Sequence, residues 1–340
     1  MNIAVFSTKG YDQRSFELAN EQFGHQLTFF DTRLCADTAS LAGGFAGVCV
    51  FVNDEADAAS IEKIAHGGTT IIATRSAGYN QIDLPAAAEN GVTVVRVPAY
   101  SPNAVSEFTV GLILTLGRQI HRAYNRVRDN NFELDGLQGF ELGNKTVGVF
   151  GTGKIGATVI KNLSGFGCRI LAFDISRNPD VEKLAEYIDD PNEIVRQADI
   201  LTFHMPLTPD TRHIINKETI PRMKDGVFIV NTSRGALLDT VAIIEGLKSG
   251  KIGYLAIDVY EEEGDLFFRD LSNQIVTDDV FARLTTFPNV LVTGHQAFLT
   301  DKALHNIAET TLNNFSEYEA TGKCENEVTW DKINPPPEPA

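Results

Sequence analysis

The sequence predicts an α/β protein with two domains, each built around a wound parallel sheet, and three observations support this fold class. Short runs of β-branched and apolar residues alternate with stretches of helix length along the chain. These runs form two series, which a long helix-compatible segment separates. The 340 residues, 43% of them hydrophobic and 22% charged, are enough for two globular domains of ordinary size.

The first series predicts one sheet near the N-terminus. Its runs are IAVFS at 3–7, AGVCVFV at 46–52, TIIAT at 70–74 and VTVVRV at 92–97. Ser101 can then cap a helix whose first turn suits Pro102, and the residues that follow are helix-compatible. We expect the domain boundary here, and the apolar helix after Ser101 is a candidate subunit interface.

The second series predicts a complete doubly wound sheet. Its six runs are TVGVFG at 146–151, RILAFD at 169–174, DILTFH at 199–204, VFIVNT at 227–232, YLAIDV at 254–259 and NVLVTG at 289–294. One more helix is expected over 300–322, and its return to the first sheet makes the first domain discontinuous. The predicted domains are 1–100 with 298–334, and 101–297; the proline-rich residues 335–340 are expected to be disordered.

Charge and cysteine content limit the partners and the compartment. A formal net charge of −16 argues against a nucleic-acid partner, because phosphate binding needs clustered Lys and Arg. No apolar run is long enough to span a bilayer and the first residues predict a strand, so no membrane partner is expected. The cysteines, at 35, 49, 168 and 324, lack CxxC spacing, which favours a reducing, cytoplasmic compartment. The histidines lack metal-ligand spacing, so no metal is expected.

A glycine-rich turn opens the second series. Gly151, Gly153 and Gly156 form a GxGxxG pattern directly after a strand and at the start of a helix. The first glycine permits a tight turn, the second lets the backbone approach a pyrophosphate, and the third allows close packing of helix on strand. The helix N-terminus, at Lys154 and Ile155, then offers free N–H groups to the anion. The turn predicts a bound dinucleotide.

The end of the next strand supports this interpretation. Asp174 lies at the spacing where an acidic residue hydrogen-bonds the adenosine ribose, and together with the turn it predicts a Rossmann domain. Its charge disfavours a 2′-phosphate, so NAD is expected, although the nearby Arg177 leaves NADP open. A glycine loop with an acidic strand end also occurs in S-adenosylmethionine-dependent methyltransferases, so these residues alone do not fix the cofactor class.

Charged and imidazole side chains follow four strands of the second series, at His204, Arg234, Glu263 and His295. Ligands of parallel sheets bind beyond the carboxyl ends of the strands, so these groups are expected near the cofactor. Arg234 can grip a carboxylate bidentately, His295 can donate a proton, and Glu263 can hold the imidazole, which suits reduction of a 2-oxo acid. Taken singly, a strand-end arginine is usually part of a surface ion pair, a lone histidine is more often structural, and an acidic run is most often a solvated loop. Composition does not decide which glutamate of 261–263 matters.

Several motifs together resemble the D-isomer-specific 2-hydroxyacid dehydrogenase family. They are, in order, GTGKIG, AFD, VNTSRGALLD, DVYEEE and TGHQAFLT, and the likeness covers residues 1–328. GFGCRILAFD, VYEEEGDLFF and VRVPAYSP resemble its fermentative D-lactate dehydrogenase branch. The resemblance implies that Arg234, Glu263 and His295 are catalytic, that NAD is the cofactor, and that a Rossmann domain is joined to a flavodoxin-like substrate domain.

The resemblance also implies the binding residues. The RSAGYNQID stretch places the substrate carboxylate against N–H groups near Ala77 and Gly78, and Tyr100 matches a tyrosine of the substrate site. Phe51 and Phe298 match positions beside the side group of the substrate, and two bulky aromatics there imply a small substituent such as a methyl. The residues that match positions at the cofactor are His204, Met205, Pro206, Thr232, Ser233 and Asp258.

The expected function is therefore NADH-dependent reduction of pyruvate, or another small 2-oxo acid, to a D-2-hydroxy acid. The resemblance implies cytoplasmic fermentation and a homodimer or homotetramer. It also implies domain closure on crossings near 98–101 and 296–299, which excludes water from the reaction. The alternatives are hydroxypyruvate, glyoxylate or a bulkier 2-oxo acid as substrate, and an NAD-sensing co-repressor that binds protein partners.

Overall fold

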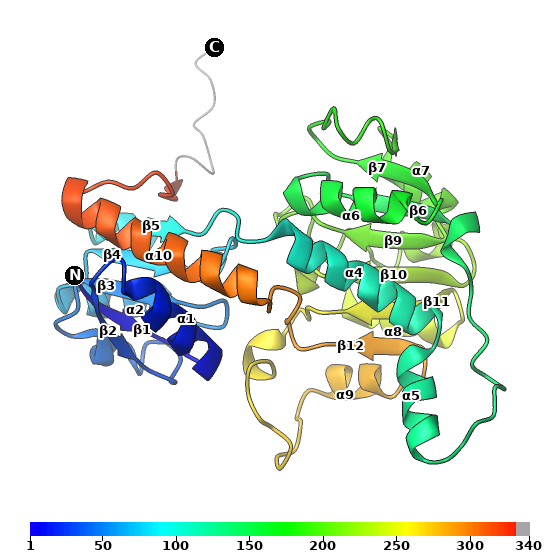
Figure 1. Cartoon of the computed structure of the whole chain (residues 1–340), viewed down its shortest axis with the longest axis horizontal. Helices are drawn as coiled ribbons and strands as arrows, with labels where there is room; N and C mark the ends of the chain where they lie inside the picture. Colours follow the sequence, from blue (N-terminus) through cyan, green and yellow to red (C-terminus); the bar gives the residue numbers. More distant parts are fainter. Residues whose placement is uncertain (331–340) are drawn as a thin grey trace. The chain divides into compact units, whose positions relative to one another are not determined.

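The computed structural model describes residues 1–330, and these form two compact units (Figure 1). The first unit contains Met1–Ser101 and the chain from Leu299 onward, and the second contains Pro102–Phe298. The predicted disordered tail at 335–340 lies outside the described residues, as do residues 331–334 of the predicted first domain.

The first unit has a five-stranded parallel sheet with the strand order β2-β1-β3-β4-β5. Its strands are β1 (Asn2–Val5), β2 (Gln26–Phe29), β3 (Gly47–Val50), β4 (Ile71–Thr74) and β5 (Thr93–Arg96). Its helices are α1 (Gly10–Asn20), α2 (Ala58–His66), α3 (Leu84–Glu89) and α10 (Asp301–Thr321), with a 3₁₀ turn η1 at Ala39–Ala42. This is the order of a flavodoxin-like sheet. Apolar cores on the two faces of the sheet pack against α2 and α3 on one side and against α1 and α10 on the other.

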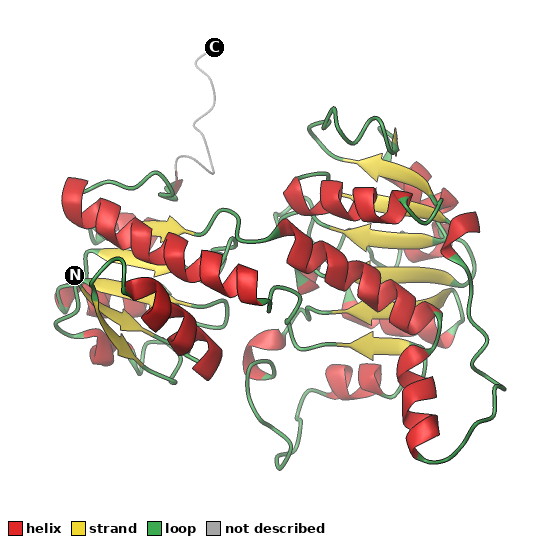
Figure 2. Cartoon of the chain, in the orientation of Figure 1, coloured by secondary structure: helices red, strands yellow, loops and turns green. Residues whose placement is uncertain are grey.

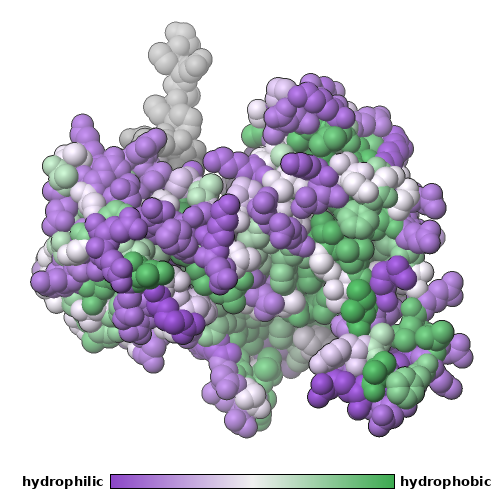
Figure 3. Space-filling view, viewed as in Figure 1, coloured by the Kyte–Doolittle hydropathy of each residue, from purple (hydrophilic) through white to green (hydrophobic). Residues whose placement is uncertain are grey.

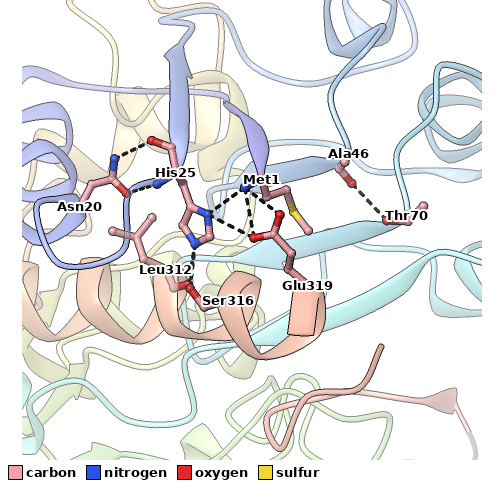
Figure 4. Close-up of polar contacts among 8 residues, drawn as sticks. All are labelled: Met1, Asn20, His25, Ala46, Thr70, Leu312, Ser316 and Glu319. Carbon is pink, nitrogen blue, oxygen red and sulfur yellow. Dashed lines mark hydrogen bonds and ion pairs between the residues drawn. The ribbon is translucent and has the colours of Figure 1, made fainter. Parts of the chain in front are cut away.

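Polar contacts fasten α10 to the start of the chain (Figure 4). The Nε2 of the buried His25 lies 2.9 Å from Ser316 Oγ and 3.3 Å from Leu312 O, both on α10. Asn20 holds the backbone of His25 from both sides, at 2.7 and 2.9 Å. Burial lowers the pKa of His25, which favours the neutral ring, and a neutral Nδ1 can accept from the amino group of Met1 at 3.2 Å. A segment from the end of the chain thus completes the N-terminal unit.

The second unit has a seven-stranded parallel sheet with the order β12-β11-β10-β9-β6-β7-β8, the doubly wound order extended by one strand (Figure 2). Its strands are β6 (Thr146–Phe150), β7 (Arg169–Phe173), β8 (Glu186–Tyr187), β9 (Ile200–Phe203), β10 (Val227–Asn231), β11 (Ile252–Ile257) and β12 (Val290–Val292). Its helices are α4 (Pro102–Gly117), α5 (Ile120–Arg128), α6 (Lys154–Ser164), α7 (Pro191–Gln197), α8 (Thr240–Lys248) and α9 (Asp279–Thr285). Short 3₁₀ turns are η2 (Leu142–Asn144), η3 (Ile220–Arg222), η4 (Gly235–Leu237) and η5 (Glu263–Asp265).

The strands of this sheet are almost wholly apolar because helices cover both faces. One core joins β6, β7, β9, β10 and β11 to α4 and α6, and the other joins the same sheet to α7, α8 and α9. All strands run parallel, so their carboxyl ends share one edge, where the predicted catalytic side chains follow β10, β11 and β12.

The helix after Ser101 differs from the sequence-based expectation. Gln119, with φ 56°, interrupts it, so that α4 and α5 are separate helices. The apolar residues of α4 are largely buried within the second unit, so most of its apolar surface packs on the sheet. Large apolar side chains are exposed on α5, at Ile120, Tyr124 and Val127. Figure 3 shows hydrophobic surface in the region of this helix. Over residues 1–330, no helix is both long enough and apolar enough to cross a membrane.

Candidate active site

The glycine-rich turn between β6 and α6 has the shape that a dinucleotide pyrophosphate needs. Gly151 has φ 90°, and a Cβ there would lie 2.7 Å from the carbonyl of His204. A Cβ on Gly156 would lie 1.9 Å from Gly151 O, so the helix approaches the turn as closely as its backbone allows. At Gly153, by contrast, a Cβ would meet open space. The first N–H groups of α6, at Lys154 and Ile155, have no acceptor within the helix, which is what binding of an anion there requires.

The acidic residue after β7 is fixed beside this turn. Asp174 Oδ2 accepts hydrogen bonds from Thr152 N at 2.5 Å and Thr152 Oγ1 at 3.1 Å, and Oδ1 accepts one from Ser176 N at 3.0 Å. Oδ1 keeps acceptor capacity, which a ribose hydroxyl can use. Arg177 forms an ion pair with Asp189 and is therefore not a free cation for a 2′-phosphate. These residues fit NAD better than NADP.

Hydrogen bonds join the ends of β6 and β9 next to the glycine-rich turn. His204, after β9, donates its N–H to Phe150 O at 2.7 Å, and its Nε2 lies 2.9 Å from Thr202 Oγ1. Burial lowers the pKa of His204 to about 3, so the ring is neutral. Its Nδ1 is buried and has no hydrogen-bond partner among residues 1–330.

The segment with Met205 and Pro206, which is predicted to pass beneath the cofactor, is hydrogen-bonded to the residues that follow β10. Ser233 Oγ donates to Met205 O at 2.7 Å, which fixes the chain just before Pro206. Thr232 Oγ1 lies 2.8 Å from the hydroxyl of Thr109 on α4, a partner that no motif in the sequence indicated. These contacts set the positions of three predicted cofactor residues relative to one another.

Arg234 follows β10 in a turn that Asn231 shapes. The Asn231 side chain donates to Arg234 O at 2.8 Å and accepts from Ser233 N at 3.0 Å. The guanidinium makes one hydrogen bond, to Ser233 O at 2.7 Å, and within the described residues it has no ion pair. Most of its N–H donors are thus available to an anionic ligand. The next residue, Gly235, lies so close to the loop after β11 that a Cβ would be 2.1 Å from Tyr260 C.

Glu263 and His295 form the predicted pair. Oε1 of Glu263 lies 2.7 Å from Nδ1 of His295, and Oε2 accepts the N–H of Tyr260 at 3.0 Å. The side chains are only 22% and 15% exposed, so the contact is shielded more than a surface ion pair. With Nδ1 facing the carboxylate, Nε2 is the ring nitrogen left to exchange a proton with a ligand.

Asp258 holds the loop that carries His295. Its buried carboxylate accepts from Thr293 Oγ1 at 2.6 Å, Gln296 N at 2.9 Å and Ala297 N at 2.8 Å. Its carbonyl accepts the N–H of His295 at 2.7 Å, and these four bonds sustain the left-handed backbone of His295 at φ 53°. Burial raises the pKa of Asp258, which the hydrogen bonds oppose. The resemblance implies that Asp258 lies near the cofactor, and its contacts in the structure also hold the backbone of the loop that carries His295.

The three consecutive glutamates at 261–263 have different surroundings in the structure. Oε1 of Glu261 accepts from Arg212 at 2.7 Å and lies 2.8 Å from His213 Nε2, while Glu262 is exposed. Only Glu263 reaches His295. The three side chains diverge because they leave a tight turn, and no property of the EEE sequence distinguishes them.

The remaining predicted substrate residues, apart from Phe298, belong to the first unit. Ala77 and Gly78 follow β4, and neither N–H has an acceptor within residues 1–330. Their carbonyls are engaged: Ala77 O accepts from Arg96 at 3.2 Å, and Gly78 O from Ser76 Oγ at 2.7 Å. The N–H groups are therefore left for an anion.

The aromatic residues predicted near the substrate lie in both units. Phe51 directly follows β3 and is 5% exposed. Tyr100 lies at the end of the crossing after β5, and its carbonyl accepts from Asn306 at 2.5 Å. Phe298, the last residue of the second unit, is 8% exposed. Among the described residues no group of His, Cys, Asp and Glu side chains has the arrangement of a metal site.

Comparisons with known proteins agree with this geometry. Residues 110–297 match the family model "D-isomer specific 2-hydroxyacid dehydrogenase, NAD binding domain". The D-lactate dehydrogenase of Escherichia coli is 51% identical over 329 residues, which are 96% of this chain and 100% of that protein. An aromatic 2-oxoacid reductase of Clostridium sporogenes is 47% identical over 330 residues, which are 96% of this chain and 99% of that protein.

A solved structure gives the same result. The apo-structure of D-lactate dehydrogenase from Escherichia coli superposes with a TM-score of 0.87 at 48% identity, covering 97% of this chain and 100% of that chain. The predicted resemblance, the two-domain α/β fold and NAD as the cofactor are confirmed. The chain belongs to the D-isomer specific 2-hydroxyacid dehydrogenase family and is an NAD-dependent 2-hydroxyacid dehydrogenase.

Proposed function

We propose that this protein reduces pyruvate to D-lactate with NADH. The observation that carries the proposal is the Glu263–His295 contact of 2.7 Å after β11 and β12. The neighbouring strand β10 is followed by Arg234, whose guanidinium has no carboxylate partner within residues 1–330. An anion-binding cation and a carboxylate-backed imidazole at one sheet edge are the groups that reduction of a 2-oxo acid requires. The relatedness to D-lactate dehydrogenases supports the choice of substrate.

Arg234 is the substrate anchor in this proposal. Its free N–H donors form a planar fork that binds the carboxylate of pyruvate and polarises the neighbouring carbonyl oxygen. The fork is aimed by the Asn231 turn and by the close packing of Gly235 on the next loop. The anchor is rigid at its backbone, which keeps the reacting carbonyl in one orientation.

His295 is the proton donor. Bound NADH supplies a hydride to the carbonyl carbon. As the carbonyl oxygen gains negative charge, the protonated imidazole gives it the proton from Nε2 and becomes neutral. Glu263 holds Nδ1–H throughout, so the ring keeps its orientation and its positive charge is stabilised before transfer. In the reverse direction the neutral ring removes the proton of the hydroxyl.

The resemblance also assigns substrate contacts to residues of the first unit, namely the N–H groups of Ala77 and Gly78 and the hydroxyl of Tyr100. It assigns Phe51 and Phe298 to the side group of the substrate, which two aromatic residues would restrict to about the size of a methyl. Hydroxypyruvate, glyoxylate and the bulkier 2-oxo acids are the competing substrates.

The test is a panel of 2-oxo acids with NADH as the reductant. Oxidation of NADH is measured with pyruvate, hydroxypyruvate, glyoxylate and phenylpyruvate, and the lactate formed is analysed for handedness. We expect the highest kcat/KM with pyruvate and only D-lactate as product. Faster turnover of phenylpyruvate, or formation of L-lactate, would contradict the proposal. Tight NADH binding without turnover of any acid would favour the NAD-sensing co-repressor.

The cellular compartment and the oligomeric state are part of the same proposal. Reduction of pyruvate regenerates NAD, which suits cytoplasmic fermentation, and all four cysteines are free, as in a reducing compartment. A homodimer or homotetramer is supported by α5, whose exposed Ile120, Tyr124 and Val127 lie three or four residues apart on one helix face.

A further inference from the structure

The most deeply buried charge in the first unit has no part in the mechanism so far. Arg75, the residue directly after β4, is 1% exposed. Its NH1 donates to Phe6 O at 2.9 Å and its NH2 to Ser7 O at 2.8 Å, while Nε lies 3.4 Å from Asp12 Oδ1. Removing a guanidinium from water costs several kcal/mol in general, and such pairs rarely increase stability over apolar side chains. A role other than stability is therefore indicated.

The flat face of the guanidinium lies on Phe51. The Arg75 Cζ is 4.6 Å from the centroid of the Phe51 ring, which is within the range of a cation–π contact. Because the guanidinium is held by two carbonyls and a carboxylate, it is a fixed surface for the ring. Lysine has no flat face to stack on an aromatic ring in this way.

Residues that follow neighbouring strands also hydrogen-bond to the backbone of Phe51. Asp54, 3% exposed, accepts from Phe51 N at 2.5 Å with one oxygen and from Ser7 Oγ and Leu34 N, both at 2.7 Å, with the other. Gln81 donates to Phe51 O at 3.2 Å. The segments that follow β1, β3 and β4, which are neighbours in the sheet, are thus connected by contacts that surround one aromatic residue, Phe51.

We propose that Arg75 is a positioning residue for substrate selectivity, which holds the Phe51 ring in the one orientation that limits the side group of the 2-oxo acid. This inference rests on the proposed substrate role of Phe51. Its action is indirect: Arg75 contacts the ring and the backbone of the first unit, and it is not assigned a contact with substrate or cofactor. A freed ring is expected to move aside and admit larger side groups.

The test is a double-mutant cycle on selectivity. The ratio of kcat/KM for phenylpyruvate to kcat/KM for pyruvate is measured in the wild type, Arg75→Met, Phe51→Leu and the double variant. We expect each single change to raise the ratio about tenfold, and the double variant to match Phe51→Leu alone. Effects that multiply in the double variant, or an unchanged ratio in folded Arg75→Met, overturn the inference.

Two further variants separate selectivity from stability. Arg75→Lys keeps the charge and loses the flat face, so the ratio of kcat/KM for phenylpyruvate to that for pyruvate is expected to rise by a smaller factor. If Arg75→Met does not fold, Arg75→Lys decides the question. An unchanged ratio in that variant then overturns the inference. Phe315→Leu weakens the core on the other face of the same sheet and should leave the ratio unchanged. A raised ratio there would mean that general loosening explains the effect, against the inference.

The proposed function is judged independently of these variants. The proposed function is tested by the 2-oxo acid that the wild type prefers. The role of Arg75 is tested by how the ratio of kcat/KM for phenylpyruvate to that for pyruvate changes between variants. The dissociation constant of NADH, measured by fluorescence, should be the same for all variants, because Arg75 belongs to the unit without the glycine-rich turn.

Discussion

Nδ1 of His295 lies 2.7 Å from Oε1 of Glu263, and the backbone of His295 has a left-handed conformation, with φ 53°. A non-glycine residue with positive φ needs surrounding bonds to sustain it, and the hydrogen bonds to Asp258 supply them. The orientation of the imidazole is thus fixed by two carboxylates with different tasks. Asp258 holds the backbone, and Glu263 holds the ring.

Glu263→Gln tests the task of the ring partner. A neutral amide does not hold Nδ1–H as firmly as the carboxylate does, so the orientation of the ring is less well fixed and we expect kcat/KM for pyruvate to fall about tenfold or more. Glu262→Gln is the matched control, because it removes the same charge from the neighbouring, exposed position. An unchanged kcat/KM in Glu263→Gln, or an equal fall in the control, contradicts the assigned role.

Arg234→Lys tests the substrate anchor. Lysine keeps the charge but cannot bind a carboxylate through two parallel hydrogen bonds, so kcat/KM for pyruvate should fall about tenfold or more. The dissociation constant of NADH, measured by fluorescence, should change little. An equal loss of NADH affinity would show that Arg234 serves the cofactor instead.

Gly153→Ala tests the pyrophosphate site. A Cβ at this position meets no protein atom, so the thermal unfolding temperature should not change, while the dissociation constant of NADH should rise about tenfold because the methyl occupies the anion site. Gly151→Ala is the contrasting variant, since its Cβ would be 2.7 Å from backbone atoms of His204 at φ 90°, and it should lower stability as well. Unchanged NADH affinity in Gly153→Ala would place the pyrophosphate elsewhere.

His204 predicts a pH dependence of stability. Burial lowers its pKa to about 3, and the unfolded residue titrates near 6.5. Between these values the unfolded chain binds a proton that the folded chain does not, so stability is present above about pH 6.5 and falls as the pH drops. From pH 6.5 to 5 the contribution lost is about 1.5 kcal/mol.

Urea unfolding across this pH range measures the effect. His204→Gln should lose less stability than the wild type over the interval, whereas His66→Gln, at an exposed position, should lose as much. Equal acid-side losses in the wild type and His204→Gln would mean that the ring is already protonated in the folded chain.

The subunit interface is tested at α5. Tyr124→Asp introduces a charge on the exposed apolar face, so light scattering should show a smaller species than the wild type. Val241→Asp, at an exposed position of α8, serves as the control and should leave the size unchanged. If Tyr124→Asp has the mass of the wild type, the interface lies elsewhere.

The fold was predictable where the apolar pattern was strong. All six predicted strands of the second series are present, because strands buried on both faces are continuous apolar runs. β2 and β8 were missed: β2 alternates exposed and half-buried residues at the sheet edge, and β8 has two residues. The break at Gln119 was missed as well, since its left-handed backbone follows from packing and not from a glycine or proline.

The sequence by itself determined which residues follow which strands, and therefore placed Arg234, Glu263 and His295 at one edge of the second sheet. It could do so because strand periodicity and the glycine turn are local properties of the chain. Only the tertiary structure decided which of three glutamates meets the imidazole, that Asp258 shapes the His295 loop, and that Arg75 lies on Phe51. These choices depend on contacts between strands far apart in sequence, where a difference of one residue turns a side chain toward a different neighbour.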